Sequence, residues 1–214
     1  MKSLMSLKRF FLFGLAALAV GQLAHAQAVA PDEFVKKLTE EVMAAVKSDR
    51  EIQSGNIRKI NSLVESKILP YVNFQKMTAS AVGRFWSQAT PEQQKQIIEQ
   101  FRLLLTYTYS GALSDVRDQK IEFRPFRGDL NDPFVEVRSQ VINPKGGDPV
   151  QLNYRLEKAA DGWRIIDVNV LGVWLVETYR GSFASEINKN GIDGLIKTLT
   201  EKNKALAAQK GRAA

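Results

Sequence analysis

The stretch WRIIDVNVLGVWLV, Trp163 to Val176, decides the fold class. It begins as a strand, in which successive side chains point to opposite faces of a sheet. Strict alternation predicts two faces, one carrying Arg164, Ile166, Val168 and Val170 and the other carrying Trp163, Ile165, Asp167, Asn169 and Leu171. Gly172 permits a bulge or a bend. The alternation fades into an apolar run, whereas an antiparallel sheet usually exposes one polar face. A second apolar face on this stretch must therefore be buried against another part of the protein.

Upstream segments predict the partners of this strand. Residues 119–126, 134–141 and 150–157 alternate apolar and polar side chains, as half-buried strands do. The sequence PKGGDP at 144–149 and the sequence AADG at 159–162 are typical of the turns that join antiparallel neighbours. Together these segments predict an antiparallel meander.

Helical periodicity precedes and follows the meander. Apolar residues recur at helical spacing in 31–48 and 56–67. A short helix is predicted after Asn73, ending at Gly83. A further helix is predicted after Val176, ending at Asn190–Gly191, and a last helix begins at Ile192. Thr90, Pro91 and Gln93 form a capping box for a helix to about Ser114. Its predicted buried stripe is Ile97, Phe101, Leu104, Leu105 and Thr108. Helices around one meander predict an α+β fold, with helices packed on a twisted antiparallel sheet.

The first 26 residues have the three parts of a secretory signal peptide. Lys2, Lys8 and Arg9 precede the apolar run FFLFGLAALAV, and Ala24-His25-Ala26 is a small-x-small cleavage site. We predict a signal peptide at 1–26 and one exported domain at 27–214, located in the bacterial periplasm. No cysteine follows the apolar run, so the sequence excludes a lipoprotein anchor.

Composition removes most catalytic chemistry from the mature chain. Cysteine is absent, and the one histidine, His25, lies in the predicted signal peptide. Thiol nucleophiles, Ser-His-Asp triads and ordinary zinc sites are therefore excluded, and we predict no metal and no cofactor. The net charge is +7, but the basic residues form no stripe with interleaved aromatics, so no nucleic-acid partner is expected.

Residues 68–199 resemble a known family. The segments ILPYVNFQKMTASAVGRFWSQATPEQQKQIIEQFRLLL, GWRIIDVNVLGVWLVETYRGSF and GIDGLIKTL follow its order and spacing. The sharpest pieces are LP after a helix, the run from Gly83 through Trp86 to the ATP-x-Q of 89–93, and the pattern W-x-x-x-D-x-x-x-x-G-V that begins at Trp163. The family is the periplasmic phospholipid-binding proteins of the maintenance-of-lipid-asymmetry (Mla) system, also called the toluene-tolerance family. Trp174 departs from the small residue expected there, which would alter the shape of a pocket if its side chain points inward.

The resemblance implies a soluble carrier of diacyl glycerophospholipid. Such a carrier moves lipid between an outer-membrane lipoprotein–porin complex and an inner-membrane ABC transporter complex, with acyl chains buried and the head group outside. The resemblance also implies a twisted antiparallel sheet of the NTF2-like type that encloses an apolar cavity, and the second apolar face of the Val168–Val176 stretch would line that cavity. We predict a lipid-binding lining of Phe74, Met77, Trp86, Phe101, Leu104, Leu105, Tyr109, Val137, Val141, Leu152, Val168, Val170, Val173, Leu175 and Tyr179.

Other interpretations stay open at this point. Taken one by one, the same apolar residues also fit an ordinary core. Arg84 and Arg180 are candidates for head-group contacts and also fit ordinary surface positions. Asp167 is a candidate general base of a small-pocket isomerase or hydrolase, with Tyr107 or Tyr154 polarising a carbonyl, or else it faces solvent or satisfies a turn. A third possibility is a protein-interaction module with an exposed apolar groove.

Overall fold

The computed structural model describes residues 29–116 and 118–213, so the predicted signal peptide lies outside the described residues. The helices are α1 (Pro31–Ser48), α2 (Arg50–Gln53), α3 (Ile57–Leu63), α4 (Phe74–Val82), α5 (Pro91–Ser114) and α6 (Leu175–Ala213), with a π-helical turn η1 (Val64–Ile68) and 3₁₀ turns η2 (Leu69–Tyr71) and η3 (Gly83–Gln88). The strands are β1 (Lys120–Phe123), β2 (Phe134–Val137), β3 (Ser139–Ile142), β4 (Val150–Ala159), β5 (Gly162–Val170) and β6 (Val173–Trp174). The predicted α+β class is confirmed.

Local signals place the helix ends where the sequence predicts them. Thr90 and Gln93 form the reciprocal capping box at the start of α5. The Asn73 side chain accepts a hydrogen bond from the Lys76 N–H at the start of α4, and Gly83 follows α4 with a φ of 65°. Gly191, at φ 73°, kinks α6 where the sequence predicts a break. Left-handed backbone of this kind favours glycine, which has no Cβ to clash.

Two predicted helical details are wrong. The helix predicted over 56–67 is α-helical only to Leu63 and then widens into η1, before Pro70, which has no N–H for the next helical bond. In α5, Thr108 is exposed, whereas Thr106 and Ser110 are buried. The reason is that the two ends of α5 bury opposite faces, since its first half packs on α6 and its last turns pack near α3.

The strands form an antiparallel sheet in the order β1-β3-β4-β5-β6, with β2 also paired to β4. The single strand predicted over 134–141 is interrupted at Arg138, although the same register continues on both sides of the break. At the break, the Ser139 N–H donates to Asn153 Oδ1 over 3.1 Å, and the Ser139 hydroxyl donates to the Leu152 carbonyl. The Asn153 side chain thus accepts the Ser139 N–H in place of a backbone carbonyl.

A bulge in β5 corrects the predicted faces of the deciding stretch. Arg155 pairs with Asp167 and Leu156 pairs with Ile165, so Ile166 is an extra residue without a partner in β4. One extra residue shifts the side-chain alternation by one position. Val168 consequently joins Ile165 on the face that packs against α1, and Asp167 turns to the other face. The bulge, rather than strict alternation, decides which apolar side chains share a face.

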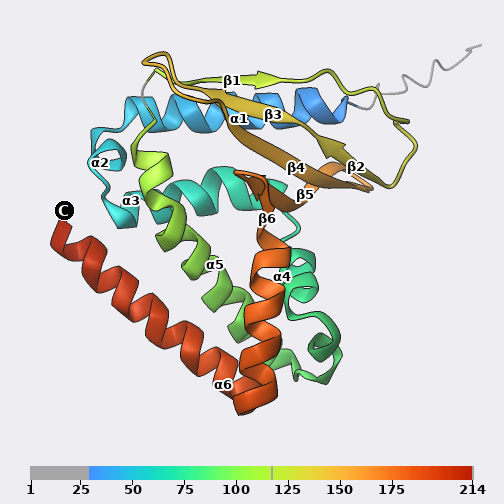
Figure 1. Ribbon diagram of the computed structural model, residues 1–214, viewed down its shortest axis with the longest axis vertical. Helices are drawn as coiled ribbons and strands as arrows, with labels where there is room; N and C mark the ends of the chain where they lie inside the picture. The colour runs from blue at the N-terminus through green and yellow to red at the C-terminus, as the bar shows by residue number, and fades with distance from the viewer. Residues whose placement is uncertain (1–28, 117, 214) are drawn as a thin grey trace, which may run out of the picture.

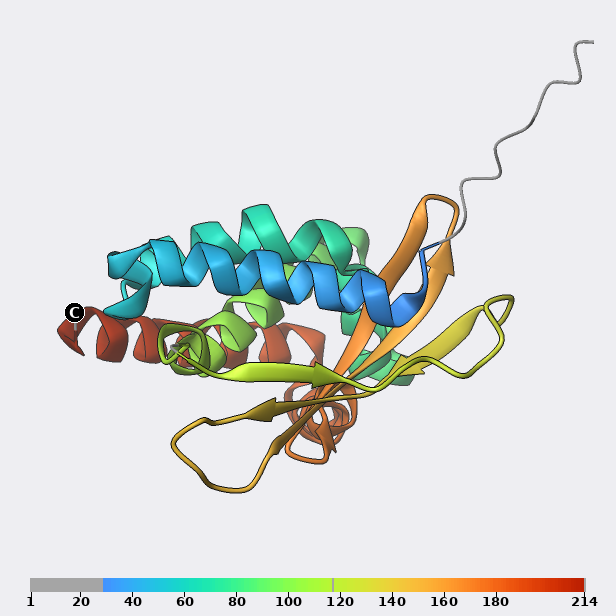
Figure 2. The same cartoon turned by 90° about the horizontal axis from the view of Figure 1, so that it is seen from above.

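The elements form a sheet layer and a helical layer (Figure 1). Helix α1 covers one face of the twisted sheet, and the β3–β4 loop projects away from the helices (Figure 2). Helices α4, α5 and α6 pack beyond the β5 side of the sheet, and the second half of α6 returns beside α5. The backbone of Asn73 donates to the Ile165 carbonyl over 2.9 Å, which ties the start of α4 to β5.

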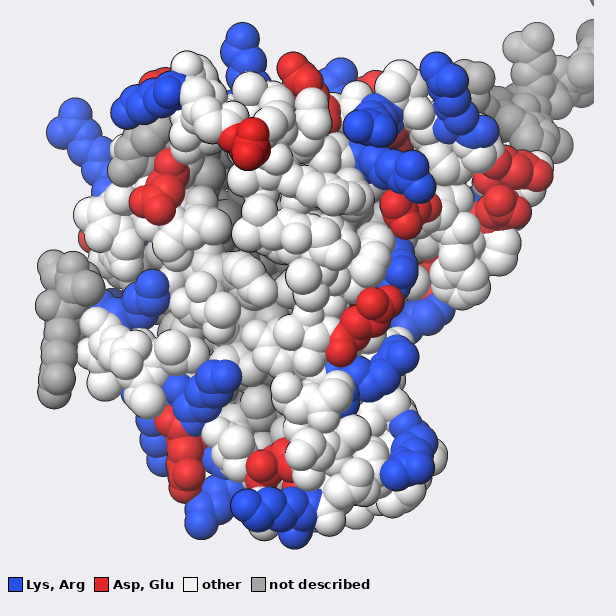
Figure 3. All heavy atoms as spheres, viewed as in Figure 1, with Lys and Arg blue, Asp and Glu red and all other residues white. Residues whose placement is uncertain are grey.

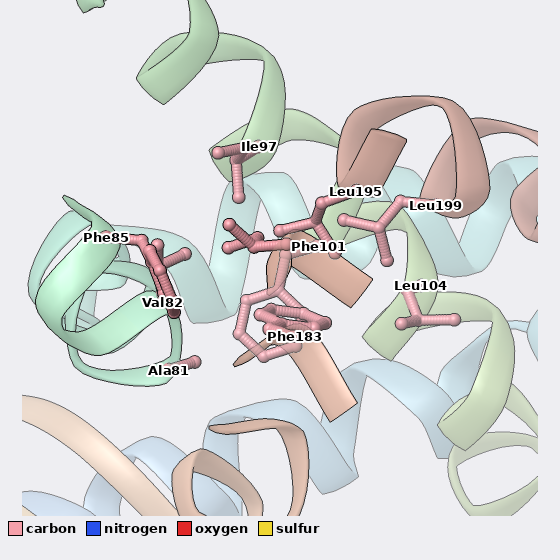
Figure 4. Packing of buried hydrophobic residues seen from close by; sticks show 10 residues of the cluster. Ala81, Val82, Phe85, Ile97, Phe101, Leu104, Phe183, Leu195 and Leu199 are labelled. Carbon is pink, nitrogen blue, oxygen red and sulfur yellow. The ribbon is translucent and has the colours of Figure 1, made fainter. Parts of the chain in front are cut away.

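The core is divided into four clusters rather than packed around one centre. The helical cluster surrounds Phe101 and Leu195 (Figure 4). The sheet cluster joins Val35 of α1 to Leu156 and Ile165, and the α3 cluster surrounds Ile60. The junction cluster, made of Met77, Leu175 and Val176, lies between the helical and sheet clusters. Half-buried apolar side chains bridge these clusters.

Candidate functional site

Most of the predicted lining residues meet in or beside these clusters. Phe101 and Leu104 belong to the helical cluster, where Phe74, Trp86, Leu105 and Tyr179 pack against it. Met77 and Leu175 belong to the junction cluster, and Val137 belongs to the sheet cluster, where Leu152 and Val168 pack against it. The tertiary fold therefore gathers residues from α4, α5, β2, β4, β5 and α6.

Five half-buried side chains connect the helical layer to the sheet. We call Val72, Phe74, Leu105, Tyr109 and Val168 the apolar band, because all five pack against the junction cluster. Phe74 and Leu105 also pack against the helical cluster, and Val72 and Val168 also pack against the sheet cluster. Each keeps part of its surface uncovered. Partly uncovered apolar side chains grouped in this way can accept an apolar ligand without exposing buried polar groups.

The chemistry around the band is apolar. Burial raises the pKa of the Tyr109 hydroxyl, and burial together with Tyr109 raises the pKa of Tyr179, against a hydrogen bond with Thr108 that lowers it. The Tyr179 ring lies edge-on to Phe101, with ring centroids 4.9 Å apart. Figure 3 shows that the middle of one molecular face is uncharged and hollowed, while most charged side chains lie around its rim.

Four predicted lining residues lie away from the band. Val141 and Val170 are half-buried outside the four clusters, and Val173 is 54% exposed at the β5–β6 turn. Trp86, on η3, reaches only the helical cluster. Trp174 stacks on Arg155, whose guanidinium carbon lies 3.9 Å from the centroid of the Trp174 ring, and it belongs to none of the four clusters. An exposed Val173 can line only the mouth of a pocket.

Sequence reasoning missed the contributions of α1 and η2. Phe34 and Tyr71 pack against the sheet cluster with ring centroids 5.9 Å apart, and Val72 belongs to the apolar band. Phe34 belongs to a helical stripe that the sequence displays, so its burial was detectable but its partner was not. Val72 forms a parallel bridge to Ile165, a contact that only the tertiary fold creates.

Two hollows, one almost entirely polar and one of mixed lining, lie elsewhere on the described surface. One, of about 340 Å³, lies between β3 and β4 and their flanking residues, and the other, of about 250 Å³, lies between the start of α1 and β1. Both have charged side chains in their lining, including Arg124 and Arg138 in the first and Asp32 in the second. The enclosed apolar cavity therefore stays a prediction.

The head-group candidates contact the helical layer. The Arg84 guanidinium carbon lies 4.9 Å from the ring centroid of Phe85, its neighbour in η3. Arg180 Nε donates to the Ser80 carbonyl over 3.1 Å and thereby joins α6 to α4. Both side chains are exposed, and their role toward a phosphate stays a prediction.

Asp167 caps a helix rather than facing solvent. The residue is 3% exposed, and its Oδ1 accepts hydrogen bonds from the N–H groups of Val168 and Val176, the second at 3.0 Å in the first turn of α6. Its Oδ2 lies 3.4 Å from Arg155 Nη1. Burial raises the pKa of the Asp167 carboxyl, although the two N–H groups and Arg155 oppose that shift. A carboxylate at a helix N-terminus is stabilised by the unpaired N–H groups there.

The tyrosine proposed beside Asp167 lies on the other face of the sheet. Tyr154 pairs with Val168 and belongs to the sheet cluster, whereas Asp167 points the opposite way. Burial raises the pKa of Tyr154 to about 12, against hydrogen bonds with Thr39 and Ser139 that lower it. The fold therefore places Tyr154 and Asp167 on opposite faces of the sheet, and the other candidate, Tyr107, lies on α5.

We expect Asp167→Asn to change the pH dependence of stability. A carboxyl whose folded pKa is raised favours folding in its protonated form, so its contribution to stability falls as pH rises through the window from the ordinary Asp pKa to the raised value. Asparagine keeps an Oδ1 acceptor for Val176 and does not titrate. Urea unfolding between about pH 4 and 7 should show this decline in the wild type relative to the variant, with the two proteins within about 1 kcal/mol at neutral pH. A loss in the variant above about 3 kcal/mol there would instead assign the dominant role to the Arg155 ion pair.

Two features are absent from the part of the chain that the structure describes. Residues 29–116 and 118–213 contain no group of three or more His, Cys, Asp or Glu side chains placed to hold a metal ion. Within the same part of the chain, no helix combines the length and apolar character needed to span a bilayer.

Sequence comparisons identify relatives over most of the chain. A family model described as MlaC protein matches residues 36–201. The intermembrane phospholipid transport system binding protein MlaC of Haemophilus influenzae is 25% identical over 201 residues, which cover 91% of this chain and 92% of the relative. The toluene tolerance protein ttg2D of Pseudomonas putida is 28% identical over 187 residues, which cover 86% and 85% of the two chains.

A solved structure of a phospholipid-binding protein is also similar to this chain. The phospholipid-binding protein of Ralstonia solanacearum, determined in complex with a phospholipid, is 47% identical and matches with a TM-score of 0.78. The match covers 81% of this chain and 96% of the other. The family match spans well over half of the sequence, and the resemblance seen in the sequence is confirmed. This chain belongs to the MlaC family.

Proposed function

We propose that this chain is a carrier that binds glycerophospholipid, with the acyl chains against the apolar band and the head group at the surface. The observation that carries the proposal is the Ralstonia solanacearum structure, a 47% identical relative in complex with a phospholipid. The apolar band supports it, because it supplies partly uncovered apolar surface between sheet and helices. The predicted lining residues, Val173 included, remain part of this proposal.

The energetics suit a carrier. Each buried methylene contributes about 0.8 kcal/mol, so a long acyl chain is held strongly against loss to water. Much of this gain only replaces burial in a bilayer, which allows exchange with a membrane or a partner. Division of the core into clusters supports the same idea, since sheet and helices can separate along the band more easily than across a single dense core.

We place this carrier in the periplasm, after removal of a signal peptide at 1–26 from a domain at 27–214. Its partners would be an outer-membrane lipoprotein–porin complex and an inner-membrane ABC transporter complex. The name of the Haemophilus influenzae relative, an intermembrane phospholipid transport system binding protein, supports this assignment.

We further propose that the chain is not an enzyme. The relatives are named for phospholipid binding or transport. Asp167 supports this view because its oxygens are engaged by α6 and Arg155.

Lipid extraction tests the proposal directly. The protein is expressed with its own leader, purified from the periplasmic fraction without detergent, extracted with organic solvent and analysed by mass spectrometry. We expect diacyl lipid at near one molecule per protein, and uptake from vesicles after delipidation. A protein that carries no lipid and takes none from vesicles would contradict the carrier. Turnover of a lipid that Asp167→Asn abolishes would instead favour the enzyme.

A further inference from the structure

The larger polar hollow, of about 340 Å³, has no role in the proposed carrier function. It lies at the break between β2 and β3, beside β4. Almost all of its lining residues are polar. The lining residues are Arg124, Glu136, Arg138, Ser139, Gln140, Pro149, Gln151 and Asn153.

The break in the sheet gives the hollow a fixed wall. Asn153 is 4% exposed, and its Oδ1 accepts the Ser139 N–H over 3.1 Å. The Ser139 hydroxyl is held by the Leu152 carbonyl. Because these groups are buried and bonded, the wall is pre-formed, and a ligand would not have to order it.

Two arginines project from neighbouring segments into the same hollow. The Arg124 N–H donates to the Arg138 carbonyl over 2.9 Å, which places the two residues side by side. Arg138 Nε donates to Glu136 Oε1 over 3.0 Å, so its terminal nitrogens remain available as donors. Among the residues that the structure describes, the Arg124 guanidinium has no ion-pair or hydrogen-bond partner.

We propose that this hollow is an oxyanion-binding site. Arg124 and Arg138 supply planar forks of N–H donors that match a carboxylate or a phosphate. The Gln151 amide is placed to recognise a hydroxyl or amide group beside the anion, whereas Gln140 Nε2 donates to Glu122 Oε2 over 3.1 Å and so leaves only its carbonyl oxygen for a ligand. Glu136 disfavours ligands with several negative charges, so the ligand is a small polar molecule or segment carrying one such group.

The site is separate from the apolar band. Gln151 and Asn153 flank Leu152 along β4 and point away from the face on which Leu152 packs. An oxyanion can therefore bind while acyl chains occupy the other side of the sheet. Loss of this site would leave the lipid content of the purified protein unchanged.

The test uses NMR titration of the full mature chain with two probes. Dimethyl phosphate presents a phosphate with a single negative charge, N-acetylglycine presents a carboxylate with an amide, and sodium chloride at equal ionic strength is the reference. We expect saturable shifts of the Arg124, Ser139 and Gln151 amides with a dissociation constant of millimolar order. Saturation by only one probe identifies the source of the anion as phosphate or carboxylate.

Matched variants assign the binding to these arginines. Arg124→Gln with Arg138→Gln should weaken binding roughly tenfold or more. Arg58→Gln removes the same kind of charge from an exposed position on α3 and should leave the affinity unchanged. Shifts that stay linear with both probes to about 50 mM, or equal weakening by the α3 variant, would overturn the proposal. Lipid extraction on the same samples separates this outcome from a failure of the carrier proposal.

Discussion

Replacing Phe101 with alanine should lower the free energy of unfolding by about 3–5 kcal/mol. Phe101 is 0% exposed at the centre of the helical cluster, where its ring meets Phe74, Tyr179 and Phe183 at centroid distances of 5.7, 4.9 and 5.2 Å. Truncation removes the buried ring area and leaves a cavity that close-packed neighbours fill only partly. Urea denaturation followed by circular dichroism measures the change.

Phe134→Ala is the matched control for this prediction. Phe134 is 56% exposed and contacts the Lys76 ammonium group 4.4 Å from its ring centroid. It should therefore lose only about 0.5–1 kcal/mol, the value of an exposed cation–π contact. Similar losses in the two variants would show that the helical cluster does not dominate stability.

Val168→Glu should reduce co-purified lipid at least about tenfold, which corresponds to about 1.4 kcal/mol of binding free energy. Val168 is half-buried and packs against both the sheet cluster and the junction cluster. A carboxylate there must either lose its hydration beside an acyl chain or displace the chain. The measurement is lipid per protein after extraction, normalised to folded protein.

A second variant and a control make the lipid result specific. Leu105→Glu places the same charge in the band from α5 and should give a similar loss. Leu130→Glu introduces the charge at a position that is 42% exposed and should keep full lipid content. If Val168→Glu and Leu105→Glu both fold and keep full occupancy, the acyl chains do not lie along the apolar band.

The helices show how far local sequence reaches. The capping box at Thr90 and Gln93, the Asn73 cap and the break at Gly191 depend on groups within a few residues of one another. Such signals predict where helices begin and end. They do not reveal which face of α5 is buried, because that depends on α6 at one end and α3 at the other.

The candidate site, unlike the helix ends, depends on contacts between residues that are far apart in the sequence. Phe74, Leu105 and Val168 are ordinary apolar residues, and their common role as a band follows from contacts between α4, α5 and β5. Phe34 and Val72 were missed for the same reason, since apolar periodicity shows that a side chain is buried but not against what. Asp167 was assigned to the wrong surroundings because the bulge at Ile166 changes the face of every later residue in the strand.

The sequence alone determined the element types, most helix ends, the α+β class and, through its motifs, the family to which the chain belongs. Tertiary structure alone decided the bulge in β5, the break at Arg138 and the meeting of half-buried residues between sheet and helices. The physical reason is the distance along the chain between the groups that interact. Caps, turns and periodicity are set by groups close along the chain, whereas a strand's faces and a pocket's walls depend on partners many residues away.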